Sequence, residues 1–205
     1  MSKLEVVRLD LSKNLLVEKI VALRKSEYSK RFNPSINLNQ LDWNFVDSSS
    51  DHYGIVYDSK LLSALRLSIH QKPEDLEICT KISTPKNVKF PVALLSRAAT
   101  LSEFQSFGLH SMIRALALSQ CLKMNIHCAL GSLEVSSMRF KQLQLLGYRV
   151  LATDSSWKNS SIPSKGPVAL VGLVGERSIK NAIEKLESRF SSTHLFFTNQ
   201  HRSLE

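Results

Sequence analysis

PVALLSRAATLSEFQSFGLHSMIRALALSQCL, residues 91–122, is the stretch of the chain that decides the fold. The apolar run Val92–Leu101 predicts a buried strand, and a helix is expected over Phe104–Met124 because its apolar residues share one face, at Leu109, Ile113, Leu116 and Ala117. A strand that enters a helix through a turn containing glycine, here Gly108, leaves backbone N–H groups unpaired at the positive end of the helix dipole. Residues 105–110 therefore predict an anion-binding turn, with a simple tight turn as the alternative.

Further strands and helices alternate on both sides of this stretch. Before it we expect a strand in LEVVRLDL, a helix over residues 13–31, a loop with one helical turn over residues 33–50, and two strands in HYGIVYDSKLLSALRLSI that join around Asp58 and Ser59. After it we expect a strand in NIHCALGSL, a helix over residues 135–146 that ends at Gly147, strands in YRVLAT and PVALVGLV, and a terminal helix over residues 179–190. This order predicts an α/β (α+β) fold with a mixed sheet. At 205 residues, a single domain over 1–205 is the simplest organisation.

The charge balance limits the kind of partner. The chain has 27 Lys and Arg against 18 Asp and Glu, which gives a net charge of +9. A surface of this sign favours acidic partners. The basic residues are dispersed and form no recognisable nucleic-acid motif, so we expect no nucleic-acid partner.

Membrane and metal functions are not indicated. No apolar run approaches the roughly 20 residues that cross a bilayer, so no stable membrane insertion is expected. The first residues, MSKLEVVRLDLSKN, have no apolar signal-peptide core, which favours a cytoplasmic location. Cys79, Cys121 and Cys128 show no CxxC spacing, so neither a zinc site nor a disulfide framework is expected, and no metal is assigned.

Residues 91–150 resemble the core of the GNAT N-acyltransferase superfamily. The phosphate-binding turn of that superfamily follows the pattern (Gln/Arg)-x-x-Gly-x-(Gly/Ala), which Gln105 and Gly108 match and from which His110 departs. The later Leu146-Gly147-Tyr148 is similar to its common Leu-Gly-Tyr/Phe ending. The resemblance implies a mixed, mostly antiparallel central sheet that is splayed at the middle and flanked by helices. It covers a core of about 15–155, followed by a strand and helix over 166–190 and a tail over 191–205.

The N-terminal half is similar to one branch, the autoinducer (N-acyl homoserine lactone) synthases and the related N-acyl amino acid synthases. The matching positions are Arg24 and Tyr28, Asp42 and Asp47, His52 and Tyr53, Arg66 and Leu67, and Ser96 and Arg97. Three positions depart from the family patterns. Leu94 stands where the autoinducer synthases carry glutamate, Trp43 lies later than their early-loop tryptophan, and Leu143 replaces a proton-donating tyrosine of many acetyltransferases. The first two departures count against S-adenosylmethionine as the acceptor.

What the resemblance implies is direct acyl transfer from a thioester to an amine such as an amino acid or a related metabolite. The backbone N–H groups of Arg97, Ala98 and Ala99 would polarise the thioester carbonyl. Asp42 and Asp47 would hold or deprotonate the amine, although aspartates in a Ser/Asn-rich loop are also common turn formers.

The remaining site residues order the acceptor loop and bind the donor. Arg24, Tyr28 and Arg66 would order the loop, and Arg97 would either pair with a loop aspartate or hold an acceptor carboxylate. The turn would bind the donor phosphopantetheine through Gln105, Ser106, Phe107, Gly108, Leu109 and His110. No tightly bound cofactor is expected, because the acyl-phosphopantetheine thioester of an acyl carrier protein or of coenzyme A is a co-substrate. The bulk of His110 and the positive net charge favour the acidic acyl carrier protein as partner.

Two other functions stay open at this point. An ordinary acetyl-CoA-dependent acetyltransferase would share the same core. A catalytically inactive GNAT-like module that binds acyl thioesters or an acidic protein would also share it, and the departures at Leu94 and Leu143 favour this alternative.

Overall fold

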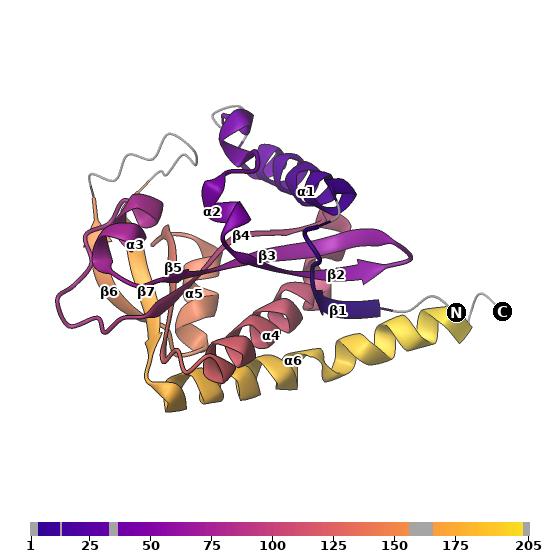
Figure 1. Ribbon diagram of the computed structural model, residues 1–205. Helices are drawn as coiled ribbons and strands as arrows, with labels where there is room; N and C mark the ends of the chain where they lie inside the picture. The colour runs from indigo at the N-terminus through magenta and orange to yellow at the C-terminus, as the bar shows by residue number, and fades with distance from the viewer. Residues whose placement is uncertain (1–3, 13, 33–36, 156–165, 203–205) are drawn as a thin grey trace.

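The computed structural model describes residues 4–12, 14–32, 37–155 and 166–202, and in these residues a seven-stranded sheet forms the centre of the molecule (Figure 1). The strand order across the sheet is β1-β2-β3-β4-β5-β7-β6. The strands are β1 (Leu4–Arg8), β2 (Asp51–Tyr57), β3 (Lys60–His70), β4 (Val92–Thr100), β5 (Cys128–Glu134), β6 (Arg149–Asp154) and β7 (Val168–Val174). All neighbouring strands pair antiparallel except β4 and β5, which pair parallel. The predicted mixed, mostly antiparallel sheet is confirmed.

The sheet opens between its two parallel strands. In the described part of the chain, β4 and β5 pair at Ala93↔Ala129 and Leu94↔Leu130, after which the two strands separate. The edge of β4 that faces β5 therefore has no strand partner from Leu95 onward. On its other edge, β4 pairs with β3 through a bulge. Because Ala64 pairs with Ala99 and Arg66 pairs with Ser96, the two β4 residues between them lie opposite one β3 residue.

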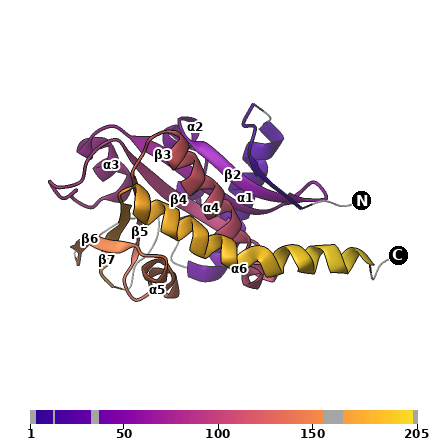
Figure 2. The same ribbon diagram turned by 90° about the horizontal axis from the view of Figure 1, so that it is seen from below.

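Helices cover both faces of the sheet (Figures 1 and 2). On one face lie α1 (Asn14–Phe32), the 3₁₀ helix η1 (Leu38–Leu41), α2 (Phe45–Ser48) and α3 (Pro73–Thr80). On the other face α4 (Leu109–Lys123) packs beside α6 (Glu176–Arg202). The remaining helices are η2 (Ser102–Phe107), which leads into α4, and α5 (Met138–Leu145). A crossover helix such as α4 is what a parallel pair requires, because a short turn cannot join parallel strands.

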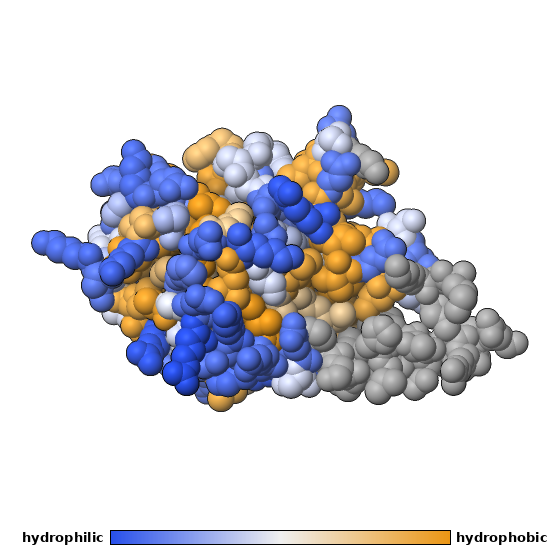
Figure 3. Space-filling view, turned by 60° about the horizontal axis from the view of Figure 1, so that its bottom comes forward, coloured by the Kyte–Doolittle hydropathy of each residue, from blue (hydrophilic) through white to orange (hydrophobic). Residues whose placement is uncertain are grey.

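Apolar side chains fill the space between these layers. The largest cluster joins α4 and α6 to the sheet and includes Leu109, Ile113, Leu118, Ile179 and Leu186. Smaller clusters lie under α1, around Ile20 and Leu23, and under α3, around Leu76. Hydrophobic atoms also reach the surface between hydrophilic bands on the lower side of the molecule (Figure 3). None of the described helices combines the length and the apolar character that a bilayer crossing needs.

Several predicted bounds need correction. The helix expected from Phe104 begins at Leu109, because residues 102–107 form η2 and Gly108 then adopts a left-handed conformation with φ of 71°. The loop over residues 33–50, expected to hold one helical turn, contains two short helices, η1 and α2, and its residues 33–36 lie outside the described residues. The terminal helix expected over 179–190 runs from Glu176 to Arg202 and so includes most of the predicted tail. Most of the polar linker before β7 also lies outside the described residues.

Candidate active site

A cluster of charged side chains is buried on the α1 side of the sheet, beside the β4 bulge. Asp47 is fully buried, and its Oδ1 accepts hydrogen bonds from Arg24 Nη1 at 2.9 Å and Arg66 Nη1 at 3.2 Å. The two arginines are 1% and 5% exposed. Burial alone would raise the pKa of the Asp47 carboxyl, but the charges of Arg24 and Arg66 outweigh it and hold that pKa below its ordinary value. Asp47 is therefore a carboxylate with little tendency to accept a proton.

The local sequence explains how Asp47 is held. Asn44 and Asp47 form a capping box at the start of α2, in which each side chain accepts a hydrogen bond from the backbone N–H of the other. This contact uses Asp47 Oδ2 and leaves Oδ1 for the arginines of α1 and β3. The side chain of Asp47 thus links α2, in which it lies, to α1 and β3.

His52 and Trp43 complete the buried cluster. His52 Nε2 donates to the backbone oxygen of Asp47 at 3.1 Å, and its Nδ1 accepts from Arg24 Nη2 at 3.4 Å. The Trp43 ring stacks on the imidazole with 4.7 Å between centroids, and the guanidinium of Arg24 lies 5.8 Å from the centroid of the Trp43 ring. Burial and the charge of Arg24 lower the pKa of His52 to about 4, so His52 is neutral at pH 7.

The β4 bulge lies next to this cluster. Arg97, one of the two bulge residues, has a left-handed backbone with φ of 53°, which is uncommon for a residue other than glycine. The Tyr28 hydroxyl donates to the carbonyl oxygen of Ala98 at 3.3 Å, and Arg66 Nε donates to Ser96 Oγ at 3.1 Å. Two residues predicted to order the acceptor loop, Tyr28 and Arg66, therefore also hold β4 beside the opening of the sheet.

The predicted anion-binding turn lies at the start of α4. Gly108 is both the C-cap of η2 and the N-cap of α4. Its φ of 71° explains why glycine stands there. Gln105 Nε2 donates back to the carbonyl oxygen of Thr100 at 3.3 Å, which joins the turn to the end of β4. Gly108 has no side chain that could cap α4, so no N-cap side chain occupies the first backbone N–H groups of this helix.

A second group of basic side chains lies behind this turn and was not predicted from the sequence. Arg114 donates to His110 Nε2 through both Nε and Nη2 at 3.3 Å, and Arg139 of α5 contacts the same nitrogen. Arg114 also donates to the Tyr148 hydroxyl at 3.0 Å and is 4% exposed. Among the described residues, no carboxylate pairs with Arg114 or Arg139. Burial and the charge of Arg114 lower the pKa of Arg139 to about 9.

The shared contact at His110 has a physical consequence. A neutral imidazole nitrogen has one lone pair, so it cannot satisfy three N–H donors from two guanidiniums. Burial and the charges of Arg139 and Arg114 hold the pKa of His110 well below its ordinary value, so His110 stays neutral. The group therefore has a surplus of donors and of positive charge between α4 and α5.

Comparisons with known proteins identify the fold. No protein-family model matches the chain, and no curated protein matches it. FeeM, an N-acyl amino acid synthase from uncultured soil microbes, is 12% identical, with a TM-score of 0.62 over 95% of this chain and 99% of its own. BjaI, a CoA-dependent acyl-homoserine lactone synthase solved with SAM and isopentyl-CoA, is 11% identical, with a TM-score of 0.64 over 91% of this chain and 90% of its own.

A third match, a probable N-acyltransferase from Enterococcus faecalis V583, is 15% identical, with a TM-score of 0.53 over 74% of this chain. This chain covers 33% of that longer protein. The fold is that of the GNAT N-acyltransferases. The GNAT architecture expected from the turn and from the Leu-Gly-Tyr ending is thereby confirmed.

The GNAT fold brings some predicted site residues together and separates others. Arg24, Asp47 and Arg66 meet in the buried cluster beside Arg97. Asp42 lies outside it, since its carboxylate is half exposed and pairs with Lys25 Nζ at 2.5 Å. The sequence had no signal for Arg114 and Arg139, because their neighbours come from different helices. His52 was matched to the family pattern without a role, and the structure places it against Asp47.

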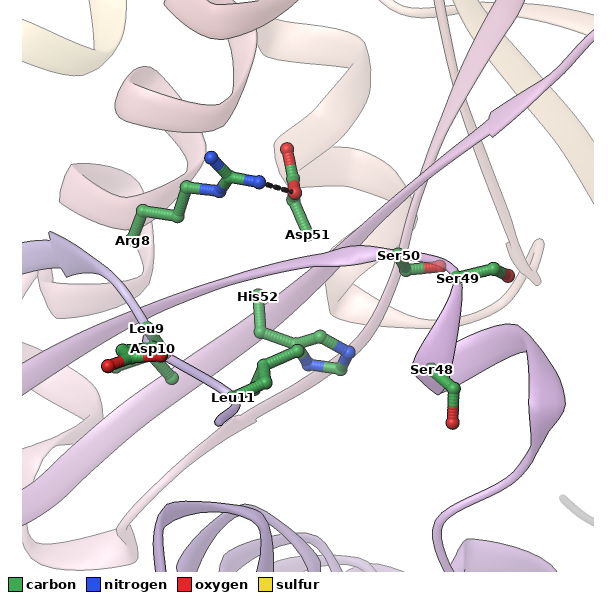
Figure 4. Close-up of a pocket in the computed structure, with 9 residues that line it drawn as sticks. All are labelled: Arg8, Leu9, Asp10, Leu11, Ser48, Ser49, Ser50, Asp51 and His52. Atoms are coloured by element: carbon green, nitrogen blue, oxygen red, sulfur yellow. Dashed lines mark hydrogen bonds and ion pairs between the residues drawn. The ribbon is translucent and has the colours of Figure 1, made fainter. Parts of the chain in front are cut away.

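One hollow of about 610 Å³ lies between the end of β1 and the α2–β2 connection, with His52 of the buried cluster in its wall (Figure 4). Its wall includes Arg8, Asp51 and the serines Ser48, Ser49 and Ser50, and none of the predicted donor or acceptor residues. Arg8 pairs with Asp51 at 2.5 Å, and the serine hydroxyls bond to carbonyls of α2 or the residue before it. These polar groups are already partnered. In the described residues, no group of three or more His, Cys, Asp or Glu side chains is placed to hold a metal ion.

The neutral, buried His52 predicts a pH dependence of stability. Its folded pKa of about 4 lies below the unfolded value of about 6.5, so between these pH values the unfolded chain binds more protons. The free energy of unfolding should therefore fall as pH drops from 6.5 to 4. Urea unfolding at intervals of half a pH unit measures the slope of the unfolding free energy against pH. His52→Gln should reduce this slope. The control His127→Gln, at an exposed histidine, should leave it unchanged. Equal slopes in all three proteins would contradict this assignment.

Proposed function

We propose that this protein is an N-acyltransferase that moves an acyl group, preferably a fatty acyl chain, from a phosphopantetheine thioester to the amine of an amino acid or related metabolite. The observation that supports this most directly is the opening between β4 and β5, with the Arg97 bulge on one side and the Gly108 turn at its end. Two proteins that share this fold support the proposal: FeeM is an N-acyl amino acid synthase, and BjaI is a CoA-dependent acyl-homoserine lactone synthase. In the reaction, the amine nitrogen attacks the thioester carbon, the C–S bond breaks, and an amide and a free thiol result.

The bulge is the proposed site of carbonyl activation. From Leu95 onward the β5-facing edge of β4 has no strand partner, so its backbone groups are available to a substrate. We assign the N–H groups of Arg97 and Ala98 in the bulge to the developing oxyanion, whereas Ala99, which the sequence also suggested, pairs with Ala64 of β3. Donors of this kind contribute about 3–4 kcal/mol to transition-state stabilisation in other acyl transfers. Tyr28 supports this segment through its bond to the Ala98 oxygen.

Asp47 acts in this proposal as a positioning residue. Its pKa is lowered and its Oδ1 is occupied by two guanidiniums, so it is a weak base. Through Arg24 and Arg66 it fixes α1 and β3 against the bulge. Asp42, which is half exposed and paired with Lys25, is the loop carboxylate that an incoming amine reaches by displacing Lys25.

We assign donor binding to the Gly108 turn and to the basic group of Arg114 and Arg139 behind it. The backbone of residues 105–110 offers N–H groups at the start of α4, and Arg114 and Arg139 add positive charge beside His110. The phosphodiester of phosphopantetheine would supply the missing acceptor oxygens. His110 is turned toward Arg114 and Arg139. The net charge of +9 favours an acidic carrier protein as donor over coenzyme A, since opposite charges steer encounter.

A thiol-release assay tests the proposal. The protein is incubated with acyl carrier proteins and coenzyme A species that carry acyl chains of different lengths, with and without a mixture of amines and amino acids. We expect thiol release that requires an acceptor, together with the amide product by mass spectrometry. Gly108→Trp should abolish release, whereas Gly175→Trp is the matched control, because Gly175 also has positive φ but faces open space at the start of α6. Donor binding without release would indicate an inactive binding module instead.

A further inference from the structure

Three guanidinium groups and one carboxylate meet beside the β4 bulge. Arg24 and Arg66 share the carboxylate of Asp47, and His52 adds no charge because it is neutral. Burial is the main cause that lowers the pKa values of Arg24 and Arg66, and the charge of Arg97 adds to it in both, so Arg97 lies within electrostatic reach of them. Three positive charges against one negative charge leave a surplus of two. Such a surplus is costly in a buried site unless an anion joins it.

Arg97 is the arginine of this cluster for which the described residues supply no carboxylate. Among the described residues no carboxylate pairs with it, and its Nη1 atom is buried without a hydrogen bond. The loop aspartates are already engaged, Asp47 by two arginines and Asp42 by Lys25. Of the two roles that the sequence leaves open for Arg97, pairing with a loop aspartate is therefore disfavoured by the structure.

We propose that Arg97 binds the carboxylate of the acceptor, which makes the acceptor an α-amino acid rather than a simple amine. The proposal rests on the acyl transfer proposed above and specifies the acceptor side of the same site. The guanidinium is suited to this task because its planar N–H groups match both oxygens of a carboxylate.

The position of Arg97 in the bulge limits the length of the acceptor. In an α-amino acid the nitrogen lies about 2.5 Å from the carboxylate carbon, as the N–Cα and Cα–C bond lengths require. The side chain that would hold the carboxylate and the backbone that would hold the thioester carbonyl belong to the same residue. A short acceptor can therefore reach both, whereas an ω-amino acid would place its amine several bonds farther away.

The surplus positive charge also selects against other acceptors. A polyamine or a simple alkylamine enters as a cation and is repelled by the cluster, whereas an amino acid enters as a neutral zwitterion whose carboxylate offsets the surplus. Nearby positive charge lowers the pKa of an ammonium group. The cluster would therefore help the bound amine to lose its proton, which the weakly basic Asp47 does not do.

The test uses sets of acceptors that differ only in the carboxylate. Each set consists of an amino acid, its carboxamide and the corresponding decarboxylated amine, and sets are made for apolar, aromatic and polar side chains. Transfer from acyl carrier protein and acyl-CoA donors is measured as kcat/KM. We expect the amino acid to exceed its amide and its amine by about 30-fold or more, mainly through KM, which is the size of effect seen when one partner of a buried charge pair is removed.

Variants of Arg97 separate binding from structure. Asparagine tolerates left-handed backbone, so Arg97→Asn removes the charge with little added strain. It should bring the three kcat/KM values of a set together, and Arg97→Lys should restore part of the preference. Arg149→Gln, at an exposed position of β6, loses the same charge and should keep the full preference. Calorimetric titration of each protein with the amino acid, in the presence of a thioether analogue of the donor, should show binding that Arg97→Asn removes.

The outcomes distinguish this inference from the proposed function. If the wild-type protein transfers acyl groups equally well to amides and amines, the carboxylate site is wrong and the acyltransferase function stands. If the preference for amino acids survives in Arg97→Asn, Arg97 is not the carboxylate ligand. If no amine or amino acid accepts an acyl group from any donor, the proposed function itself is wrong.

Discussion

Asp47→Asn is expected to lower the free energy of unfolding by about 3–5 kcal/mol, the range found when one partner of a buried ion pair is removed. Asparagine keeps the shape of the side chain but leaves Arg24 and Arg66 buried without a negative charge. Domains of this kind are stable by about 5–15 kcal/mol, so a large part of the total would be lost. Urea unfolding followed by circular dichroism measures the change.

The matched control for this prediction is Asp42→Asn. Asp42 pairs with Lys25 at the surface, and exposed pairs of this kind contribute about 0–1 kcal/mol. A double-mutant cycle adds a second check, because Arg66→Gln should cost less in the Asp47→Asn background than in the wild-type protein. Additive effects, or equal losses in the two aspartate variants, would show that the buried pairs do not stabilise the fold as described.

The pH dependence of the same group has a defined sign. The pKa of Asp47 is lower in the folded protein than in the unfolded chain. Its contribution to stability is therefore fully present above the unfolded value of about 3.9 and is lost as pH falls through the folded pKa. This loss lies below the pH range in which His52 acts, so the two contributions are separable.

Arg139→Gln is expected to raise the KM for a phosphorylated donor by about ten- to a hundredfold, because hydrogen bonds to charged groups contribute about 1.5–3 kcal/mol. Arg139 and Arg114 converge on His110 with more donors than that nitrogen accepts, and a phosphate would satisfy the surplus. The measurement compares three donors with the same acyl chain, attached to coenzyme A, to phosphopantetheine or to pantetheine without phosphate. The unphosphorylated donor should show no loss.

Lys141→Gln is the matched control for Arg139, since Lys141 is an exposed basic residue two positions later on α5. It should leave all three KM values unchanged. An equal loss with all three donors in Arg139→Gln would indicate that Arg139 only packs α5 against α4. A loss confined to coenzyme A would place the nucleotide phosphates, rather than the phosphodiester, at this group.

Patterns over short distances predicted much of the fold. The helical recurrence of Leu109, Ile113, Leu116 and Ala117 predicted α4, and the β2–β3 hairpin was expected around Asp58 and Ser59, both of which have positive φ. The start of α4 was placed too early because Ser102–Phe107 forms a separate 3₁₀ helix directly before Gly108 and α4. Short α-helical and 3₁₀ segments differ in their hydrogen bonds rather than in their composition. The periodicity of a sequence therefore does not distinguish the two.

The candidate site was predicted less completely than the fold. The Gly108 turn could be predicted because it is a local feature, in which a glycine stands where the backbone needs positive φ. By contrast, the two loop aspartates looked alike in the sequence, and the structure separates them into a buried partner of two arginines and a half-exposed partner of Lys25. Burial decides their chemistry, and burial depends on α1 and β3 rather than on the loop itself.

The sequence alone thus determined the α/β architecture, the position of the Gly108 turn and the sign of the net charge, because propensity, periodicity and composition act within a few residues or over the chain as a whole. Among the described residues, the tertiary structure alone decided that β4 and β5 separate after Leu94, that Nη1 of Arg97 is buried without a hydrogen-bond partner, and that Arg114 meets Arg139. Those features depend on which side chains from distant elements share a buried volume. Electrostatic energies change steeply with distance and with exclusion of water, so they are defined only once the chain is folded.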